Sequence, residues 1–147
     1  MHELVSISSV ASSITLGIVH AHASYGIFST IVAPVPRNRK SETHMRRKLL
    51  KRIDETKVCL GLFQAGYTHY GTADFIGAYR GVPIAIELKS GMKALTTKYP
   101  PHQEEWANNW VVTGRGLYVL SNAYWFATTT QFIGMLDSMV DPIIGAQ

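Results

Sequence analysis

The sequence predicts an α/β fold in which helices flank a mixed central β-sheet. Three observations lead to this prediction. Residues 41–55 have the apolar spacing of an amphipathic helix, and residues 71–91 form two apolar stretches around a short Gly-containing turn. Residues 100–121 contain a second helical pattern followed by another apolar strand. That order of helices and strands is typical of an α/β sandwich.

Composition and charge narrow the class of protein. The 147 residues suffice for one domain with a modest core, and 46% hydrophobic content excludes a disordered chain. All 14 Lys and Arg lie at or after Arg37, together with nine acids, so this part carries +5 (14 − 9). Such a balance suits a polyanionic partner, although a plain basic surface gives the same number. The single cysteine, Cys59, excludes an intrachain disulfide and fits a reducing, cytoplasmic setting.

The first 36 residues differ from the rest, because no charged residue occurs from Leu4 to Pro36. Ser, Thr and His interrupt the apolar run, which argues against a membrane-spanning helix of about 20 apolar residues. The basic "RNRK" that follows keeps membrane association of residues 4–36 open as a rival. We treat residues 1–36 as an appendage of unknown role, which the composition would allow to be poorly ordered. Residues 37–147 form the predicted domain.

The first helix of the domain is predicted over residues 41–55. Ser41 suits the N-cap, and Glu42 falls in the first turn, where the helix dipole favours an acid. One face carries an apolar stripe of Met45, Leu49, Leu50 and Ile53. The opposite face carries Arg46, Arg47, Lys48, Lys51 and Arg52. A solvated face is the default for such a run, and a phosphate-contacting face is the alternative.

The remaining elements follow in order. Residues 57–64 are predicted as a strand, 65–72 as a Gly- and Tyr-rich loop and 90–101 as a long polar connection. The helix over 100–112 begins with proline, which suits a first turn, and Gly114 is placed to end it. A strand over 116–121 follows. A closing helix is predicted over 123–140, with its aromatic residues turned inward.

The hairpin within residues 71–91 has a register that its turn determines. If Arg80 and Gly81 form a two-residue turn, Asp74 lies opposite Glu87, with Cβ atoms roughly 4.5–5.5 Å apart. Lys89 lies two residues beyond Glu87 and shares its face. The other face carries Ile84, Ile86 and Leu88. A slip of one residue would move Glu87 to the other face.

Two carboxylates side by side repel each other unless a proton or a cation lies between them. Magnesium suits hard oxygen ligands, and a metal beside a lysine can activate water and stabilise charge on a phosphoryl oxygen. The sequence therefore predicts a metal site at Asp74 and Glu87. An exposed edge hairpin with a surface Lys–Glu pair is the alternative.

At these residues the chain resembles the PD-(D/E)XK nuclease superfamily, and more narrowly the VRR-NUC family found in phages and in some repair nucleases. The resemblance covers residues 42–122 and follows the family's order. It rests on Glu42, "GTADFIG", "AIELK", Gln103 and "GRGLYVLSN". Ala73 stands where the family usually has a proline before the aspartate. The resemblance implies a restriction-endonuclease-like core.

The resemblance also implies roles for the site residues. Asp74, Glu87 and the backbone carbonyl of Leu88 would bind Mg²⁺, for which Mn²⁺ substitutes. Lys89 would position the attacking water or neutralise charge on the phosphorane. Glu42 would bind a second metal or orient water, and Gln103 would brace the site or contact nucleic acid.

The implied activity is metal-dependent endonucleolytic cleavage of DNA. Stand-alone members resemble junction-resolving enzymes, which implies branched DNA as substrate and a homodimer. The predicted DNA-contact surface comprises Arg46, Arg47, Lys51, Arg52, Lys93, Lys98 and Arg115. Two rivals stay open: a non-catalytic nucleic-acid-binding module of the same fold, and a small membrane-associated protein. Metal-dependent cleavage tests the first, and the behaviour of a chain that begins near Arg37 tests the second.

Overall fold

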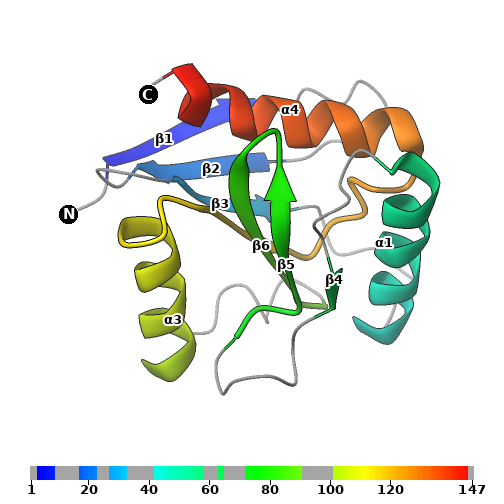
Figure 1. Ribbon diagram of the computed structural model, residues 1–147, viewed down its shortest axis with the longest axis horizontal. Helices are drawn as coiled ribbons and strands as arrows, with labels where there is room; N and C mark the ends of the chain where they lie inside the picture. Colours follow the sequence, from blue (N-terminus) through cyan, green and yellow to red (C-terminus); the bar gives the residue numbers. More distant parts are fainter. Residues whose placement is uncertain are drawn as a thin grey trace.

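The computed structural model describes residues 3–8, 17–22, 27–32, 42–57, 63–64, 72–90 and 101–145. Up to residue 32, and at 63–64, the description covers backbone pairing only. The elements in chain order (Figure 1) are β1 (Glu3–Ser8), β2 (Gly17–His22), β3 (Ile27–Val32), α1 (Glu42–Thr56), β4 (Phe63–Gln64), β5 (Phe75–Tyr79), β6 (Val82–Leu88), α3 (Pro101–Val112), β7 (Leu117–Ser121) and α4 (Thr129–Gly145).

The strands form one sheet in the order β1-β2-β3-β7-β6-β5-β4. β7 runs parallel to both of its neighbours, β3 and β6, and the other pairs are antiparallel. The α/β class and the mixed sheet are therefore confirmed. Parallel neighbours need a crossover connection, and α3 lies in the one that joins β6 to β7.

The β5–β6 hairpin has the register that its turn predicts. Tyr79 pairs with Val82 and Phe75 pairs with Ile86. Arg80 and Gly81 have φ values of 53° and 80°. Positive φ at both central residues is the feature of a type I′ turn, whose twist matches that of the flanking strands.

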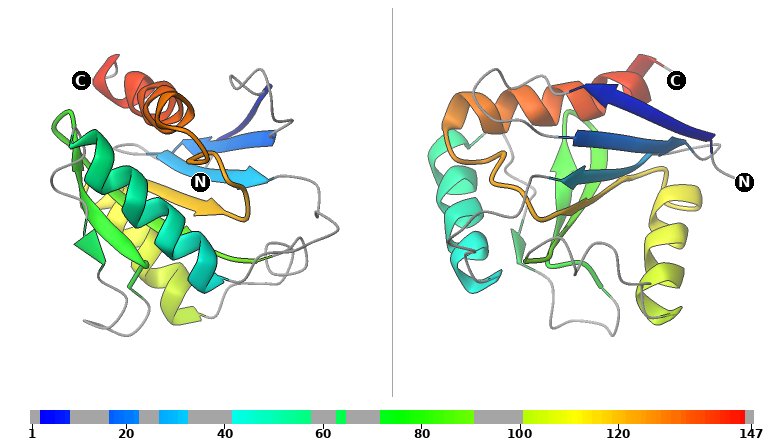
Figure 2. Two further views of the ribbon diagram at one scale, coloured as in Figure 1. Left: turned by 90° about the vertical axis from the view of Figure 1, so that its right-hand side faces the viewer. Right: turned by 180° about the vertical axis from the view of Figure 1, so that it is seen from behind.

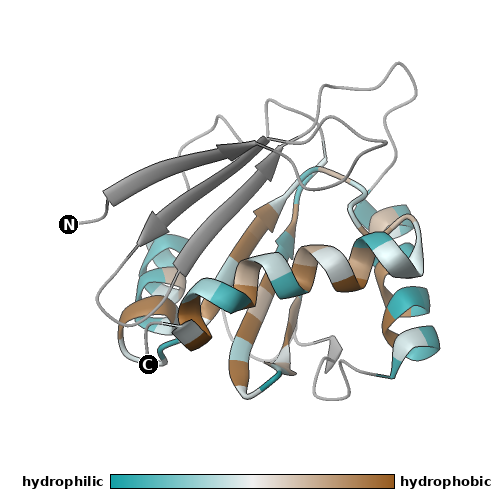
Figure 3. Ribbon diagram, turned by 90° about the horizontal axis from the view of Figure 1, so that it is seen from above, coloured by the Kyte–Doolittle hydropathy of each residue, from teal (hydrophilic) through white to brown (hydrophobic). Residues whose placement is uncertain are grey.

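Helices cover both faces of the β5–β6–β7 region (Figures 1 and 2). Ile84, Ile86 and Leu88 of β6 belong to the larger apolar cluster, which includes residues of α1 and α4. Ala85, on the opposite face, belongs to a smaller cluster with Ala107 and other residues of α3. Hydrophobic stretches run along the central strands beneath α4 (Figure 3). The predicted division of β6 between two faces is therefore confirmed.

The helix predicted over residues 41–55 and its apolar stripe are confirmed by α1. Met45, Leu49 and Ile53 are buried against the larger cluster, and Leu50 is partly buried beside it. The helix ends before Lys57, which has a left-handed φ of 55°. The expected N-cap, Ser41, lies outside the described residues.

The start predicted for the closing helix is wrong. Helix α4 begins at Thr129 rather than at 123, and it runs to Gly145 with Pro142 inside it. The hydroxyl of Thr128 accepts a hydrogen bond from the Gln131 backbone N–H at 3.2 Å, so Thr128 caps the helix. Trp125 is fully buried as predicted, but it lies in the turns before the helix.

The end of α3 also differs in detail. The helix stops at Val112, before Gly114 as expected, but the left-handed residue that follows is Arg115, with φ of 54°. Gly116 is needed for another reason. A Cβ added there would overlap the indole of Trp110, whose Nε1 donates to the Leu117 carbonyl at 3.1 Å.

The segment that sequence analysis separates from the domain supplies strands of the same sheet. Strand β3 pairs in parallel with β7, from Ile27 opposite Leu117 to Ile31 opposite Ser121. None of the helices in the described parts of the chain has the length and apolar character needed to cross a membrane. The predicted strand over 57–64 is described only at β4, and Cys59 and the connection over 91–100 lie outside the described residues.

Candidate functional site

The turn of the hairpin brings Asp74 and Glu87 together. Asp74 directly precedes β5, Glu87 lies near the end of β6, and only 8% and 6% of these residues are exposed. The Asp74 backbone N–H donates to Glu87 Oε1 at 3.2 Å, and the Leu88 N–H donates to Asp74 Oδ2 at 2.9 Å. The predicted juxtaposition of two carboxylates is therefore present, and it is buried rather than on an exposed edge.

Two cationic side chains face this carboxylate pair. Lys89 Nζ lies 3.6 Å from Glu87 Oε2, and Arg46 Nη2 lies 2.9 Å from Asp74 Oδ1. With the two backbone donors, each of the four carboxylate oxygens has a donor or a cation beside it. Groups of the protein itself therefore contact every oxygen of the two carboxylates.

Glu87 has an unusual acidity. Burial raises the pKa of Glu87 from its ordinary value near 4.5 to about 8. Side-chain hydrogen bonding to Asp74 and the charge of Asp74 contribute to the same rise in pKa, while the ammonium of Lys89 acts in the opposite direction. Glu87 therefore retains a proton at pH 7, because a second negative charge beside Asp74 is costly in a buried site.

Glu42 approaches the pair only through Arg46. Its Oε2 lies 3.6 Å from Arg46 Nη2, one helical turn along α1. Arg46 therefore bridges Glu42 and Asp74. The structure places Glu42 at the periphery of the site.

Gln103 lies in the first turn of α3 and is half-buried. Its Oε1 is shielded from solvent and accepts no hydrogen bond from the described residues. None of the contacts described above connects Gln103 to the carboxylate pair. Its predicted role at the site is therefore neither supported nor opposed by a contact.

The two carboxylates are few for a metal site, but their number is compatible with magnesium. The described residues contain no cluster of three or more His, Cys, Asp or Glu side chains that could hold a metal. Magnesium, however, often takes only one or two protein carboxylates and keeps several waters. Burial and the charge of Asp74 raise the pKa of Glu87, and a divalent cation would relieve the repulsion between the two carboxylates. The pair, with the Leu88 carbonyl, could therefore hold Mg²⁺.

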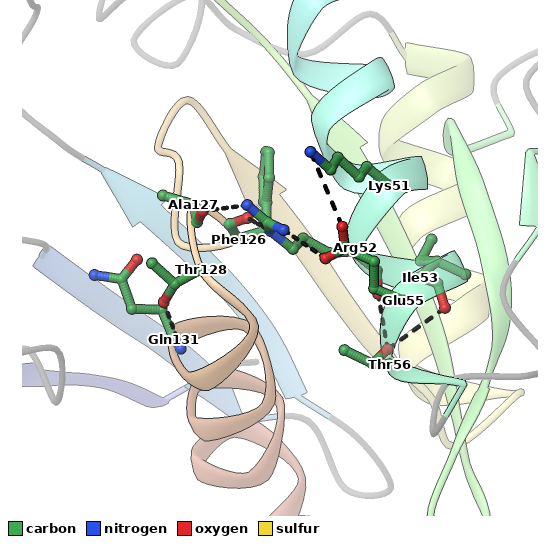
Figure 4. A network of polar contacts seen from close by, with 9 residues as sticks. All are labelled: Lys51, Arg52, Ile53, Glu55, Thr56, Phe126, Ala127, Thr128 and Gln131. Atoms are coloured by element: carbon green, nitrogen blue, oxygen red, sulfur yellow. Dashed lines mark hydrogen bonds and ion pairs between the residues drawn. The ribbon is translucent and has the colours of Figure 1, made fainter.

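Only some residues of the predicted DNA-contact surface are exposed to solvent. Arg52 turns inward and donates from Nε to the Phe126 carbonyl at 2.9 Å and from Nη2 to the Ala127 carbonyl at 2.5 Å (Figure 4). Its side chain is only 12% exposed. Arg52 thus fastens α1 to the turns before α4, and Arg46 faces Asp74. The residues that stay exposed are Arg47, Lys51 and Arg115. Lys93 and Lys98 lie outside the described residues.

Sequence reasoning missed two features. It placed Arg46 on the DNA-contact surface, although the Glu42–Arg46 spacing of four residues already indicated an ion pair at the helix start. It also gave no weight to Trp106 and Trp110, whose rings stack 5.1 Å apart on α3. These two tryptophans line a shallow groove together with Asn109, Thr113 and Gly114.

Comparison of the chain with protein-family models, with curated proteins and with solved structures gave no match. The resemblance to VRR-NUC nucleases therefore rests on the motif residues and on their arrangement.

Proposed function

We propose that the protein is a metal-dependent endonuclease that hydrolyses phosphodiester bonds in DNA. The observation that carries the proposal is the buried, adjacent pair Asp74 and Glu87 with Lys89 beside it. Two adjacent buried acids, one of which has its pKa raised to about 8, are costly for a purely structural hairpin. Perturbed acids of this kind are concentrated at functional sites.

Each residue has a role in the proposal. Asp74, Glu87 and the Leu88 carbonyl would hold Mg²⁺ or Mn²⁺, which would lower the pKa of a bound water and stabilise charge on phosphoryl oxygens. Lys89 Nζ donates hydrogen bonds to the attacking water or to a phosphoryl oxygen as negative charge develops. Glu42 orients water or binds a second metal through its partly exposed carboxylate. Gln103 offers an amide whose Oε1 lacks a donor among the described residues.

The binding partner in the proposal is DNA, with branched or junction DNA as the preferred form and a homodimer as the active species. The exposed Arg47, Lys51 and Arg115 supply phosphate contacts in a chain of net charge +4. Arg52 is left out of this surface, because its guanidinium is bound to two backbone carbonyls.

Cleavage of linear duplex, single-stranded and four-way-junction DNA with Mg²⁺ or Mn²⁺ tests the proposal. We expect cleavage that EDTA abolishes and that Asp74→Asn and Lys89→Ala lower at least about 100-fold, as loss of a catalytic group does. Asp54→Asn, which removes an exposed acid from α1, is the matched control. Equal cleavage by Asp74→Asn and the parent would show that the site is assigned wrongly.

A non-catalytic nucleic-acid-binding module is the second candidate. It is favoured by the pairing of Arg46 with Asp74 and of Lys89 with Glu87, since an internally satisfied cluster can be purely structural. DNA binding that survives Asp74→Asn, without cleavage by any form of the chain, would support this candidate.

A further inference from the structure

Arg46 occupies the position at Asp74 that a bound cation would need. Its Nη2 lies 2.9 Å from Asp74 Oδ1, while Asp74 Oδ2 already accepts the Leu88 N–H at 2.9 Å. The side chains of Arg46 and Asp74 are 28% and 12% exposed, so the ion pair is shielded from bulk water. Asp74 therefore has one oxygen held by a guanidinium and the other by the sheet backbone.

A divalent cation cannot share Oδ1 with this guanidinium without close contact between like charges. Two cations a few ångströms apart repel strongly where solvent screening is weak. A cation that binds Asp74 must therefore displace Arg46. The Leu88 N–H is fixed by β6, which pairs with β5 and β7, so Arg46 is the partner that can move.

We propose that Arg46 is a built-in competitor of the divalent cation, which neutralises Asp74 until the cation displaces it. The inference rests on the proposed metal site. It assigns to Arg46 a regulatory function in place of the DNA-contact role that the sequence suggests. Glu42 supplies the second position for the displaced arginine, since its Oε2 already lies 3.6 Å from Nη2, and in that state it orients water rather than binding a second metal.

The competitor has a measurable consequence for cation affinity. Arg46→Gln keeps a polar, though shorter, side chain and removes its charge, so Mn²⁺ no longer has to displace a guanidinium. Isothermal titration of the full chain with MnCl₂ at pH 8.5 and fixed ionic strength measures the dissociation constant directly. We expect Arg46→Gln to bind Mn²⁺ about three- to tenfold more tightly than the parent, which corresponds to loss of one shielded ion pair.

A matched control separates this local effect from the general loss of a positive charge. Lys48→Gln removes one charge from the same helix, and none of the ion pairs described here joins Lys48 to Asp74. We expect it to change the Mn²⁺ dissociation constant less than about twofold, as distant screened charges do. Arg46→Lys retains a charge but loses the planar fork, and its affinity should lie between those of the parent and Arg46→Gln.

The possible outcomes separate the inference from the proposed function. If Asp74→Asn abolishes Mn²⁺ binding while both Arg46 variants bind no more tightly than the parent, the competitor role is overturned and the metal site stands. If Asp74→Asn binds Mn²⁺ as the parent does, or if neither the parent nor Arg46→Gln binds Mn²⁺, both proposals fail. Circular dichroism shows whether each variant is folded. If Arg46→Gln does not fold, the Mn²⁺ affinity of Arg46→Lys is compared with that of the parent instead.

Discussion

At the scale of single residues, the most informative feature is the buried contact between Asp74 and Glu87, beside which the pKa of Glu87 is raised. Their opposition could be predicted, because the two-residue turn at Arg80-Gly81 fixes which residues pair. Their burial could not, since it depends on packing between elements that are distant in the sequence. The Arg46–Asp74 ion pair was unpredictable for the same reason: it joins residues 28 positions apart across two elements.

The raised pKa of Glu87 makes stability depend on pH. The folded protein keeps a proton that the unfolded chain releases above its ordinary value near 4.5, so the free energy of unfolding falls as pH rises from about 4.5 to about 8. The stabilising contribution is fully present below that window and lost above it. The loss is at most about 5 kcal/mol, at 1.36 kcal/mol per pKa unit.

Glu87→Gln tests this dependence, because a neutral amide cannot titrate. Urea denaturation at several pH values between 5 and 9 should show a smaller decline for Glu87→Gln than for the parent. Asp54→Asn, at an exposed position of α1, should keep the parental decline. Identical pH profiles for the parent and Glu87→Gln would mean that Glu87 is ionised throughout the range.

Added Mg²⁺ should raise the free energy of unfolding of the parent more at pH 8.5 than at pH 6, because protons and cations compete for Asp74 and Glu87.

At the scale of elements, the hairpin and α1 could be predicted because local rules decide them. A two-residue turn with positive φ fixes the register of β5 and β6, and the i, i+4 spacing of Met45, Leu49 and Ile53 fixes the buried face of α1. The start of α4 could not be predicted from hydrophobicity, since Trp125 and Phe126 are buried from a non-helical turn. The polar Thr128 gave the better signal, as a helix cap.

The conformation of the hairpin turn can be tested by substituting Gly81, with Gly134 of α4 as the control. Gly81→Ala forces an alanine to a φ of 80°, and we expect a loss of about 1–2 kcal/mol in the free energy of unfolding. Gly134→Ala, at an exposed position of α4 with open space around it, should instead gain about 0.5–1 kcal/mol from helix propensity. Urea denaturation followed by tryptophan fluorescence measures both. A Gly81→Ala protein as stable as the parent would indicate a different turn.

At the scale of the whole molecule, β7 is the strand on which the sheet depends. All five of its residues are buried, and it lies between β6 and β3. The strand could be predicted from the sequence, but its second neighbour could not, because the uncharged segment from Leu4 to Pro36 has no clear alternation. The boundary drawn at residue 36 follows charge composition, whereas the sheet crosses it.

Removing residues 1–36 tests how far the sheet needs that segment. A chain that begins at Arg37 loses the strand paired with Leu117–Ser121, and an open edge strand invites association with other chains. We expect it to keep its helices but to unfold at a lower urea concentration and to form larger species in light scattering. A shortened chain with the parental midpoint and mass would show that β7 does not need β3.

The pairing of β3 with β7 also sets an order of events during synthesis. Ile27 pairs with Leu117, a separation of 90 residues (117 − 27), so this contact closes a long loop. Contacts of such sequence separation form slowly, and they cannot form before the later partner has left the ribosome. The hairpin that carries Asp74 and Glu87 needs no such wait, since its strands are adjacent in the chain. The nascent protein would therefore assemble its carboxylate pair before its sheet is complete.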